Sequence, residues 1–344
     1  MLLTVVLGGC GTLGYYGQAL HGGAALLLAR QPISAVAADP AVSVRTRQGL
    51  QLVTAARRFA RDELQLPVAG EFDTYVDLRR EYAVWNVYAA PPLALELHRW
   101  CYPIAGCAVY RGYFSEGDAR AYGEQLSAQG WDVYVGGVIA YSTLGWFDDP
   151  VLNTFVGYGD FDLLGLIFHE LAHSRVYVPG DSRFNESFAT FVEEAGVERW
   201  FALHPSPVRL AAYHHERKLR GEFLAFMHQQ RAQFEALYRA DLTVAEKLRR
   251  KAELITAMRA AYHAAATSFR GRYDLFFGRD FNNARLATLT TYHDWVPAFR
   301  ALRVKVSNWA AFYLAVEALG RLPMVQREQR LRELAPDHAP ELTQ

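Results

Sequence analysis

The sequence predicts an α+β fold, with an N-terminal half that mixes strands and helices and a C-terminal half that is mainly helical. Short runs rich in β-branched and aromatic residues, typical of strands, lie between residues 74 and 141. After residue 156, apolar residues recur at helical spacing along heavily charged stretches. A short motif of histidines and a glutamate lies where the two halves meet, and ligand sites often occupy such a junction.

The composition is that of a folded globular protein. The chain has 344 residues, of which 51% are hydrophobic and 21% charged, so it can bury a large core. Lys and Arg together number 36, as do Asp and Glu, so no overall electric field attracts the chain to nucleic acid or to an anionic membrane. We therefore expect no nucleic-acid partner.

The N-terminal half is expected to alternate helices and strands. Its predicted helices span residues 11–35, 45–65 and 116–129, and its predicted strands lie within residues 74–88, 108–114 and 131–141. Pro67 and Gly70 follow the second helix, and Gly130 ends the third.

The C-terminal half is expected to contain helices at residues 163–176, 186–201, 207–238, 244–270 and 308–322, with a loop at 281–283. The two longest are heavily charged and should form a hairpin or bundle, with charges such as those of Glu246–Lys251 on solvated faces. We divide the chain into a signal remnant (1–10), an α+β part (11–155) and a helical part (156–344), the last two forming one continuous catalytic unit.

The N-terminus ends its apolar run in Leu7-Gly8-Gly9-Cys10. This resembles the end of a bacterial lipoprotein signal, in which small residues precede a cysteine that becomes lipidated. The pattern predicts a lipid anchor on Cys10 as the chain's only link to a membrane, and a place on the periplasmic side of a bacterial envelope. No basic residue precedes the run, which a start site assigned too far downstream would explain; the alternative is a buried strand with a free cysteine.

Cys101 and Cys107 enclose a short loop that contains Pro103 and Gly106. In an oxidising compartment the two cysteines can form a disulfide if the loop turns back, and these two residues favour such a turn. The alternative is a pair of unpaired buried thiols. A zinc site from this pair is not expected, because no further cysteine completes it.

The residues that carry the predicted chemistry are His169-Glu170-Leu171-Ala172-His173. Positions i and i+4 of a helix lie on the same face, so both imidazoles can point at one ion. Glu170 is rotated by about 100° from His169, which places it beside the ion as a general base rather than as a ligand. The alternative is an amphipathic helix that happens to carry two histidines and a glutamate.

A catalytic zinc ion has three protein ligands and one open position for water. Glu186, which follows Asn185 on the next predicted helix, is the expected third ligand, giving a single zinc ion bound by His169, His173 and Glu186. The alternative role for Glu186 is that of an acid favoured near a helix N-terminus. Glu193 and Glu194 are the nearest carboxylates that could orient the imidazoles from behind.

The motif HELAH followed by FNESFATFVEEAG resembles that of gluzincin metallopeptidases, which carry H-E-x-x-H and then N-E-x-x-A/T on the next helix. Most of the chain also resembles a family of bacterial "putative aminopeptidases". The similar segments are residues 101–114, 140–155, 169–196 and 282–299. The resemblance implies a zinc-dependent peptidase, of aminopeptidase type, acting on peptides; the alternative is a membrane-tethered scaffold that binds zinc without peptidase activity.

Further roles follow from the resemblance. Gluzincins stabilise the oxyanion with a Tyr or a His, for which Tyr292 is the first candidate and His293 the second. The alternative is a packed aromatic ring and a surface histidine. The segment at 135–146, which continues the predicted strand at 131–141, could pair with the substrate backbone along its edge, or could be an internal strand with a glycine bulge.

An aminopeptidase must also hold the free α-amine of its substrate. The acidic residues that could do so are Asp148, Asp149, Glu193 and Glu194. The run His214-His215-Glu216 lies on a charged helix, and its neighbours are too close to converge on a second ion, so we expect it at the surface.

Overall fold

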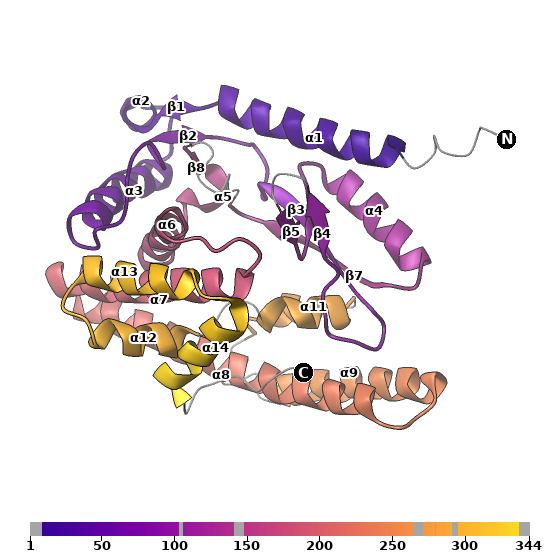
Figure 1. The fold of residues 1–344 in the computed structure, drawn as a ribbon. Helices are drawn as coiled ribbons and strands as arrows, with labels where there is room; N and C mark the ends of the chain where they lie inside the picture. Colours follow the sequence, from indigo (N-terminus) through magenta and orange to yellow (C-terminus); the bar gives the residue numbers. More distant parts are fainter. Residues whose placement is uncertain are drawn as a thin grey trace.

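The computed structural model describes residues 9–102, 106–140, 148–264, 271–278, 280–290 and 295–336. The fold is mixed α+β, with its strands in the N-terminal half and mostly helices in the C-terminal half, so the predicted fold class is confirmed (Figure 1).

The strands form two small sheets and a hairpin. The first sheet is antiparallel, in the order β6 (Arg111–Tyr113), β3 (Val84–Ala90) and β7 (Asp132–Val138). The second has the order β1 (Gln31–Pro32), β2 (Thr74–Val76) and β8 (Val151–Leu152), with β2 and β8 parallel. The hairpin joins β4 (Trp100–Tyr102) to β5 (Gly106–Ala108).

The helices of the N-terminal half are α1 (Gly9–Leu28), α2 (Ile33–Ala38), α3 (Val44–Asp62), α4 (Glu116–Ala128) and α5 (Asn153–Val156). Those of the C-terminal half are α6 (Asp160–Arg175), α7 (Ser182–Leu203), α8 (Pro207–Arg239), α9 (Val244–Ala264), α11 (Asn283–Ala287), α12 (Val296–Val304), α13 (Trp309–Gly320) and α14 (Met324–Leu334). Short 3₁₀ turns lie at Asp274–Phe277 and Thr288–Thr290.

Several predicted boundaries were wrong. The helix expected over 11–35 ends at Leu28, whereas the strands expected between 74 and 88 are present as β2 and β3, which belong to different sheets. The helix expected to begin at Glu186 begins at Ser182, because Asp181 caps it by accepting a hydrogen bond from the Phe184 amide at 3.0 Å. The sequence analysis did not predict α12 and α14, which are short and begin at proline-containing segments.

The main core lies where α6 and α7 pack against each other and against α3, α12 and α13. Phe168 of α6 packs against α3, and Phe188 and Phe191 of α7 pack against rings of α12 and α13. All three are 2% exposed or less. Because both of these helices are packed on several sides, the side chains that they present to each other are held firmly.

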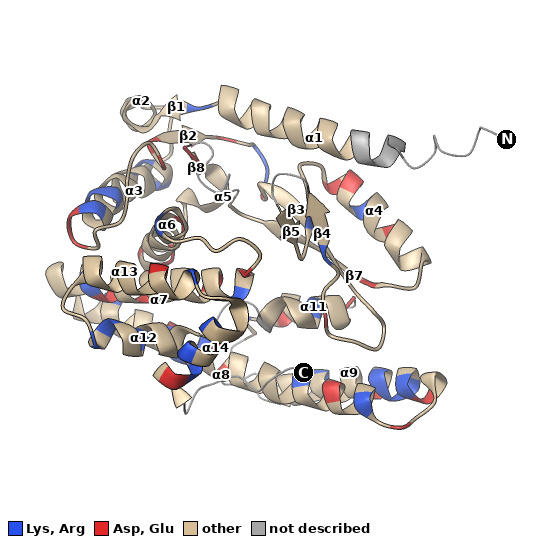
Figure 2. Cartoon of the chain, in the orientation of Figure 1, with Lys and Arg blue, Asp and Glu red and all other residues tan. Residues whose placement is uncertain are grey.

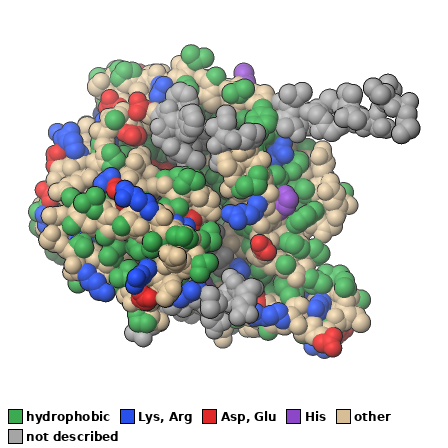
Figure 3. All heavy atoms as spheres, viewed as in Figure 1, with side chains coloured by type: hydrophobic (Ala, Val, Ile, Leu, Met, Phe, Trp, Pro, Cys, Tyr) green, Lys and Arg blue, Asp and Glu red, His purple; other side chains and the backbone are tan. Residues whose placement is uncertain are grey.

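The α8–α9 hairpin was predicted and is confirmed. Its inner face packs Phe223, Phe234, Met258 and Tyr262 into a second core cluster. Its outer face carries charges of both signs (Figure 2), among them the ion pair of Glu246 with Arg250 one turn later. The face of the molecule drawn in Figure 3 likewise shows Lys and Arg among Asp, Glu and hydrophobic side chains, with no single sign of charge covering it.

The cysteine predictions have different outcomes. Cys101 and Cys107 face each other across the β4–β5 hairpin and are joined by a disulfide. Cys10 lies in α1, and its lipidation stays a prediction, because the structure does not describe its side chain. Among the described residues, no helix is both long and apolar enough to cross a bilayer.

Candidate metal centre

The histidine motif lies in the C-terminal half of α6. Asp160 and Asp162 occupy the first turn, where negative charge favours helix formation, and the helix ends at Arg175. Leu171 and Ala172, inside the motif, are fully buried and hold this turn of the helix against the core. His169 and His173 lie on the same face of α6, with ring centroids 5.0 Å apart.

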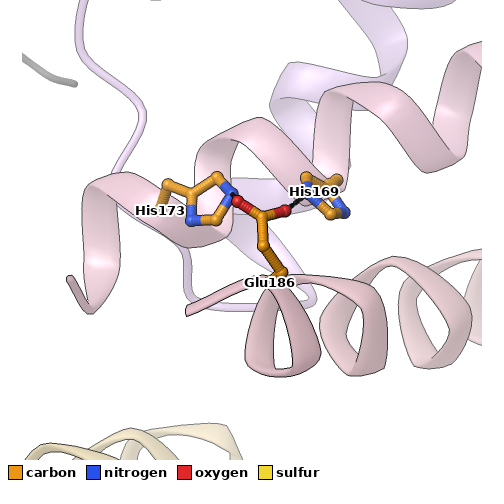
Figure 4. A group of neighbouring side chains, drawn as sticks. All are labelled: His169, His173 and Glu186. Atoms are coloured by element: carbon orange, nitrogen blue, oxygen red, sulfur yellow. Dashed lines mark hydrogen bonds and ion pairs between the residues drawn. The ribbon is translucent and has the colours of Figure 1, made fainter. Parts of the chain in front are cut away.

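Glu186 faces these imidazoles from α7. The ligand atoms offered by His169, His173 and Glu186 all lie within 4.8 Å of one another. The Glu186 carboxylate lies between the two rings, with one oxygen 3.2 Å from His169 Nε2 and the other 3.7 Å from His173 Nε2 (Figure 4). The structure therefore brings together the residues that the sequence predicted as metal ligands.

Asn185 has a positioning role that the sequence analysis did not assign. Its side chain is 2% exposed and lies beside the segment that connects α6 to α7. The amide nitrogen donates to the Val178 carbonyl at 2.9 Å, and the amide oxygen accepts from the Val178 amide at 2.8 Å. This double hydrogen bond fixes the connection next to Glu186.

Glu193 contacts the other nitrogen of His169. Its Oε2 lies 3.1 Å from His169 Nδ1, so the ring can donate to this carboxylate while Nε2 faces Glu186. Gly165 lies one turn before His169, and a Cβ there would be 3.1 Å from Glu193 Cγ. The absence of a side chain at Gly165 thus gives Glu193 room to reach the imidazole.

Glu194 does not have the predicted orienting role. Its carboxylate accepts from Arg217 of α8 at 2.7 Å and from Arg300 of α12 at 2.6 Å. Consecutive helical residues point about 100° apart, so only one of the neighbouring glutamates can face α6. Glu194 instead ties α7 to the helices on its other side.

The electrostatics of the cluster favour a positive charge at His169 and a neutral His173. Burial alone would lower the pKa of His169, but hydrogen bonds to Glu186 and Glu193 outweigh it and raise the pKa to about 10. Burial and the charge of His169 lower the pKa of His173 to about 4. Burial would raise the pKa of Glu186, but its hydrogen bond to His169 and the charge of that ring lower it.

These residues fit a divalent ion of the zinc type. Two imidazoles and one carboxylate are the donor set of many catalytic zinc sites. Glu186 is ionised and His173 is neutral, as metal ligands must be. The two carboxylates around His169 favour a positive charge at this ring, and a bound metal ion would supply that charge in place of the ring's second proton. Within the described residues, this is the one group of three such side chains with suitable spacing.

Glu170 lies beside the cluster in a buried position. Burial raises the pKa of its carboxyl to about 7; the charge of His169 opposes this rise, and the charges of Glu186, Asp149 and Glu193 add to it. Asp149 is itself only 8% exposed and lies two residues before the start of β8. The structure thus places two further acidic groups, Glu170 and Asp149, near the three candidate ligands.

The candidate oxyanion donors Tyr292 and His293 lie outside the described residues. The described chain resumes at Trp295, whose backbone amide donates to Ser187 Oγ at 3.2 Å. Ser187 directly follows Glu186, so residue 295 lies next to the part of α7 that carries the third candidate ligand.

Strand β7 lies at the edge of its sheet. It pairs residue for residue with β3 over its whole length, so the alternative of an internal strand with a glycine bulge is wrong. Part of its outer edge is occupied, since Asn282 donates to the Val133 carbonyl at 2.7 Å. Local packing explains the glycine at position 137, because a Cβ there would lie 2.3 Å from the Tyr82 ring.

A cavity of about 980 Å³ lies between α7, α8, α12 and α14. Glu193 and Glu194 contribute to its wall, whereas His169, Glu170, His173 and Glu186 are not among its lining residues. The cavity therefore borders the candidate centre only through Glu193.

The run His214-His215-Glu216 was expected at the surface. His214 and His215 are exposed and Glu216 pairs with Arg272, which is consistent with that expectation.

The fold and the cluster together define an α+β protein with a candidate metal centre built on two consecutive, tightly packed helices. The chain belongs to the family described as "Putative aminopeptidase", whose model matches residues 14–331. Membership of this family indicates a peptidase. Comparison with curated proteins and with solved structures finds no match.

Proposed function

We propose that this protein is a zinc-dependent peptidase of aminopeptidase type, with one zinc ion bound by His169, His173 and Glu186. The observation that carries the proposal is the position of the Glu186 carboxylate between two imidazoles of the preceding helix. A zinc ion bound there would lower the pKa of a bound water and polarise the scissile carbonyl.

Glu170 is the proposed general base. It directly follows His169, so the helix turns it to the side of the ligand cluster, where it can accept the proton of the attacking water. The same carboxyl can then deliver the proton to the leaving amine.

Glu193 is the proposed positioning residue for His169. A hydrogen bond from His169 Nδ1 to Glu193 fixes the orientation of the ring and keeps Nε2 directed at Glu186. Such a contact also makes the imidazole a more basic ligand.

Asp149 is the proposed anchor of the substrate's free amine. Of the two neighbouring candidates that precede β8, Asp148 is exposed, whereas Asp149 is 8% exposed. The charge of Asp149 contributes to the raised pKa of Glu170, which indicates that the two carboxyls are close. The edge of β7 beyond Val133 is a proposed docking strand for the peptide backbone.

The decisive experiment compares the purified protein with Glu170→Gln and with a matched control, Glu124→Gln, on the exposed side of α4. We expect about one zinc ion per chain in all three, with turnover of aminoacyl anilides lost about 100-fold or more only in Glu170→Gln. Zinc binding without turnover, across aminoacyl anilides and internally quenched peptides, would instead support a zinc-binding scaffold. Cleavage of the quenched peptides alone would identify an endopeptidase.

We also propose that the chain is anchored through lipidated Cys10 on the periplasmic side of a bacterial envelope. The disulfide between Cys101 and Cys107 supports an oxidising compartment. Metabolic labelling with palmitate tests the anchor: label should enter the parent and be absent from Cys10→Ala. Equal labelling of both proteins, or of neither, would refute it.

A further inference from the structure

Tyrosines from separate parts of the chain gather beside the candidate metal centre. Tyr88 lies on β3 opposite Tyr134 of β7, and the two rings are stacked with centroids 5.9 Å apart. Tyr110, in the turn between β5 and β6, packs against Tyr88 with centroids 5.8 Å apart. These three rings form a continuous aromatic surface on one side of the sheet.

Tyr177 lies in the connection between α6 and α7, and its charge acts on Tyr110. It follows α6, four positions after His173, and precedes Val178, whose backbone is held by both hydrogen bonds of the Asn185 amide. Since Asn185 is followed by Glu186, this connection keeps Tyr177 close to two of the candidate ligands.

The charges of the centre act on these phenols. Burial raises the pKa of Tyr88 to about 12 and also raises the pKa of Tyr177, and the carboxylate of Glu186 adds to both shifts. Partial burial and the neighbouring Tyr88 raise the pKa of Tyr110, with further contributions from Glu186, Tyr177 and Glu170. Tyr110 is thus near both a candidate ligand and the proposed base.

A ligand can reach two of these rings from the solvent. Tyr110 is 41% exposed and Tyr177 45% exposed, while Tyr88 and Tyr134 are partly buried behind them. The guanidinium of Arg285 lies 4.5 Å from the centroid of Tyr134 and covers that end of the stack. The open part of the aromatic surface is therefore the part next to the candidate centre.

We propose that Tyr88, Tyr110 and Tyr177 form a specificity subsite that binds an aromatic side chain of the peptide residue adjacent to the scissile bond. This inference rests on the proposed peptidase function. Aromatic rings attract one another edge to face or offset, and tyrosine offers a rigid surface at small entropic cost. An aliphatic methyl group offers no ring face or edge, and so would gain few of these contacts.

The test measures kcat/KM for phenylalanyl and alanyl anilides with the parent, Tyr110→Ala, Tyr177→Ala and Tyr110→Phe. Tyr16→Ala, on exposed α1, is the matched control. The parent should prefer the phenylalanyl substrate by about 10-fold or more. Each alanine variant should lose roughly 2- to 10-fold on that substrate alone, whereas Tyr110→Phe and the control should keep the preference.

A second measurement does not depend on turnover. Dissociation constants of phenylalanine amide and alanine amide for Glu170→Gln, with and without Tyr110→Ala, should show that Tyr110 contributes only to binding of the aromatic amide. If this holds without any turnover in the parent, the subsite stands and the peptidase function falls. If the parent turns over its substrates but Tyr110→Ala binds both amides as well as the unchanged protein does, the peptidase function stands and the subsite falls.

Other results would also overturn the subsite. An equal loss on both substrates in Tyr110→Ala, or a large loss in Tyr110→Phe, would mean that the hydroxyl acts on the reaction itself. A preference for lysyl or arginyl substrates over phenylalanyl ones would mean that the rings receive a cation instead.

Discussion

Replacing Glu193 by alanine is expected to weaken zinc binding by about 10- to 100-fold, or roughly 1.4 to 2.8 kcal/mol. The magnitude follows from the contact that is lost. Glu193 Oε2 lies 3.1 Å from His169 Nδ1, and the two side chains are only 25% and 14% exposed. The bond is thus partly shielded from water, and its loss leaves a buried ring nitrogen without its carboxylate acceptor. Glu193→Gln should lie between alanine and the parent, because an amide oxygen still accepts from Nδ1.

The assay is competition for zinc with a chromophoric chelator at fixed pH, with Glu124→Gln as the matched control. The expected order of affinity is parent and control, then Glu193→Gln, then Glu193→Ala. Circular dichroism of each variant verifies that the helices are intact. Identical affinities for all four proteins would refute the argument that Glu193 positions His169, and so would a loss in the control of the same size.

Two predictions concern stability after the metal is removed with a chelator. Burial raises the folded-state pKa of Glu170 from 4.5 to about 7, so its stabilising contribution is fully present below pH 4.5 and is lost as the pH rises through about 7. In urea unfolding, Glu170→Gln should therefore be more stable than the parent at pH 8, by on the order of 3 kcal/mol. At pH 4.5 the variant should lose this advantage. A difference in stability that does not change with pH would contradict this reasoning. Asn185→Ala should lower the free energy of unfolding by about 2–4 kcal/mol, because both buried backbone groups of Val178 lose their partners; a loss below about 0.5 kcal/mol in the same assay would show that Asn185 does not fix the connection.

The sequence was most informative where chemistry depends on local spacing. His169 and His173 share a face because they are one helical turn apart, and this needs no knowledge of the remaining chain. The partner of Glu193 was harder to predict, since Glu193 and Glu194 are adjacent and their directions depend on how α7 is rotated against α6. That rotation is set by distant packing, including the space at Gly165 and the anchoring arginines on α8 and α12.

The aromatic surface could not be predicted from spacing at all. Tyr88, Tyr110 and Tyr177 are far apart in the chain, and each belongs to an unremarkable local pattern. Tyr110 comes next to Tyr88 because β3 pairs with β6, which begins directly after Tyr110, and Asn185 holds the connection after α6 that carries Tyr177. Sites assembled from tertiary contacts of this kind leave no periodic signal in the sequence.

The packing of α6 on α7 explains why the candidate centre can be precise although much of the chain around it is loop. Asn185 fixes the near end of the helix pair through Val178, and Gly165 admits Glu193 one turn before His169 at the far end. Glu186 lies between these two contacts, so neither a rotation nor a slide of α7 can occur without breaking one of them. The spacing of the candidate ligands is therefore a consequence of the helix pair itself.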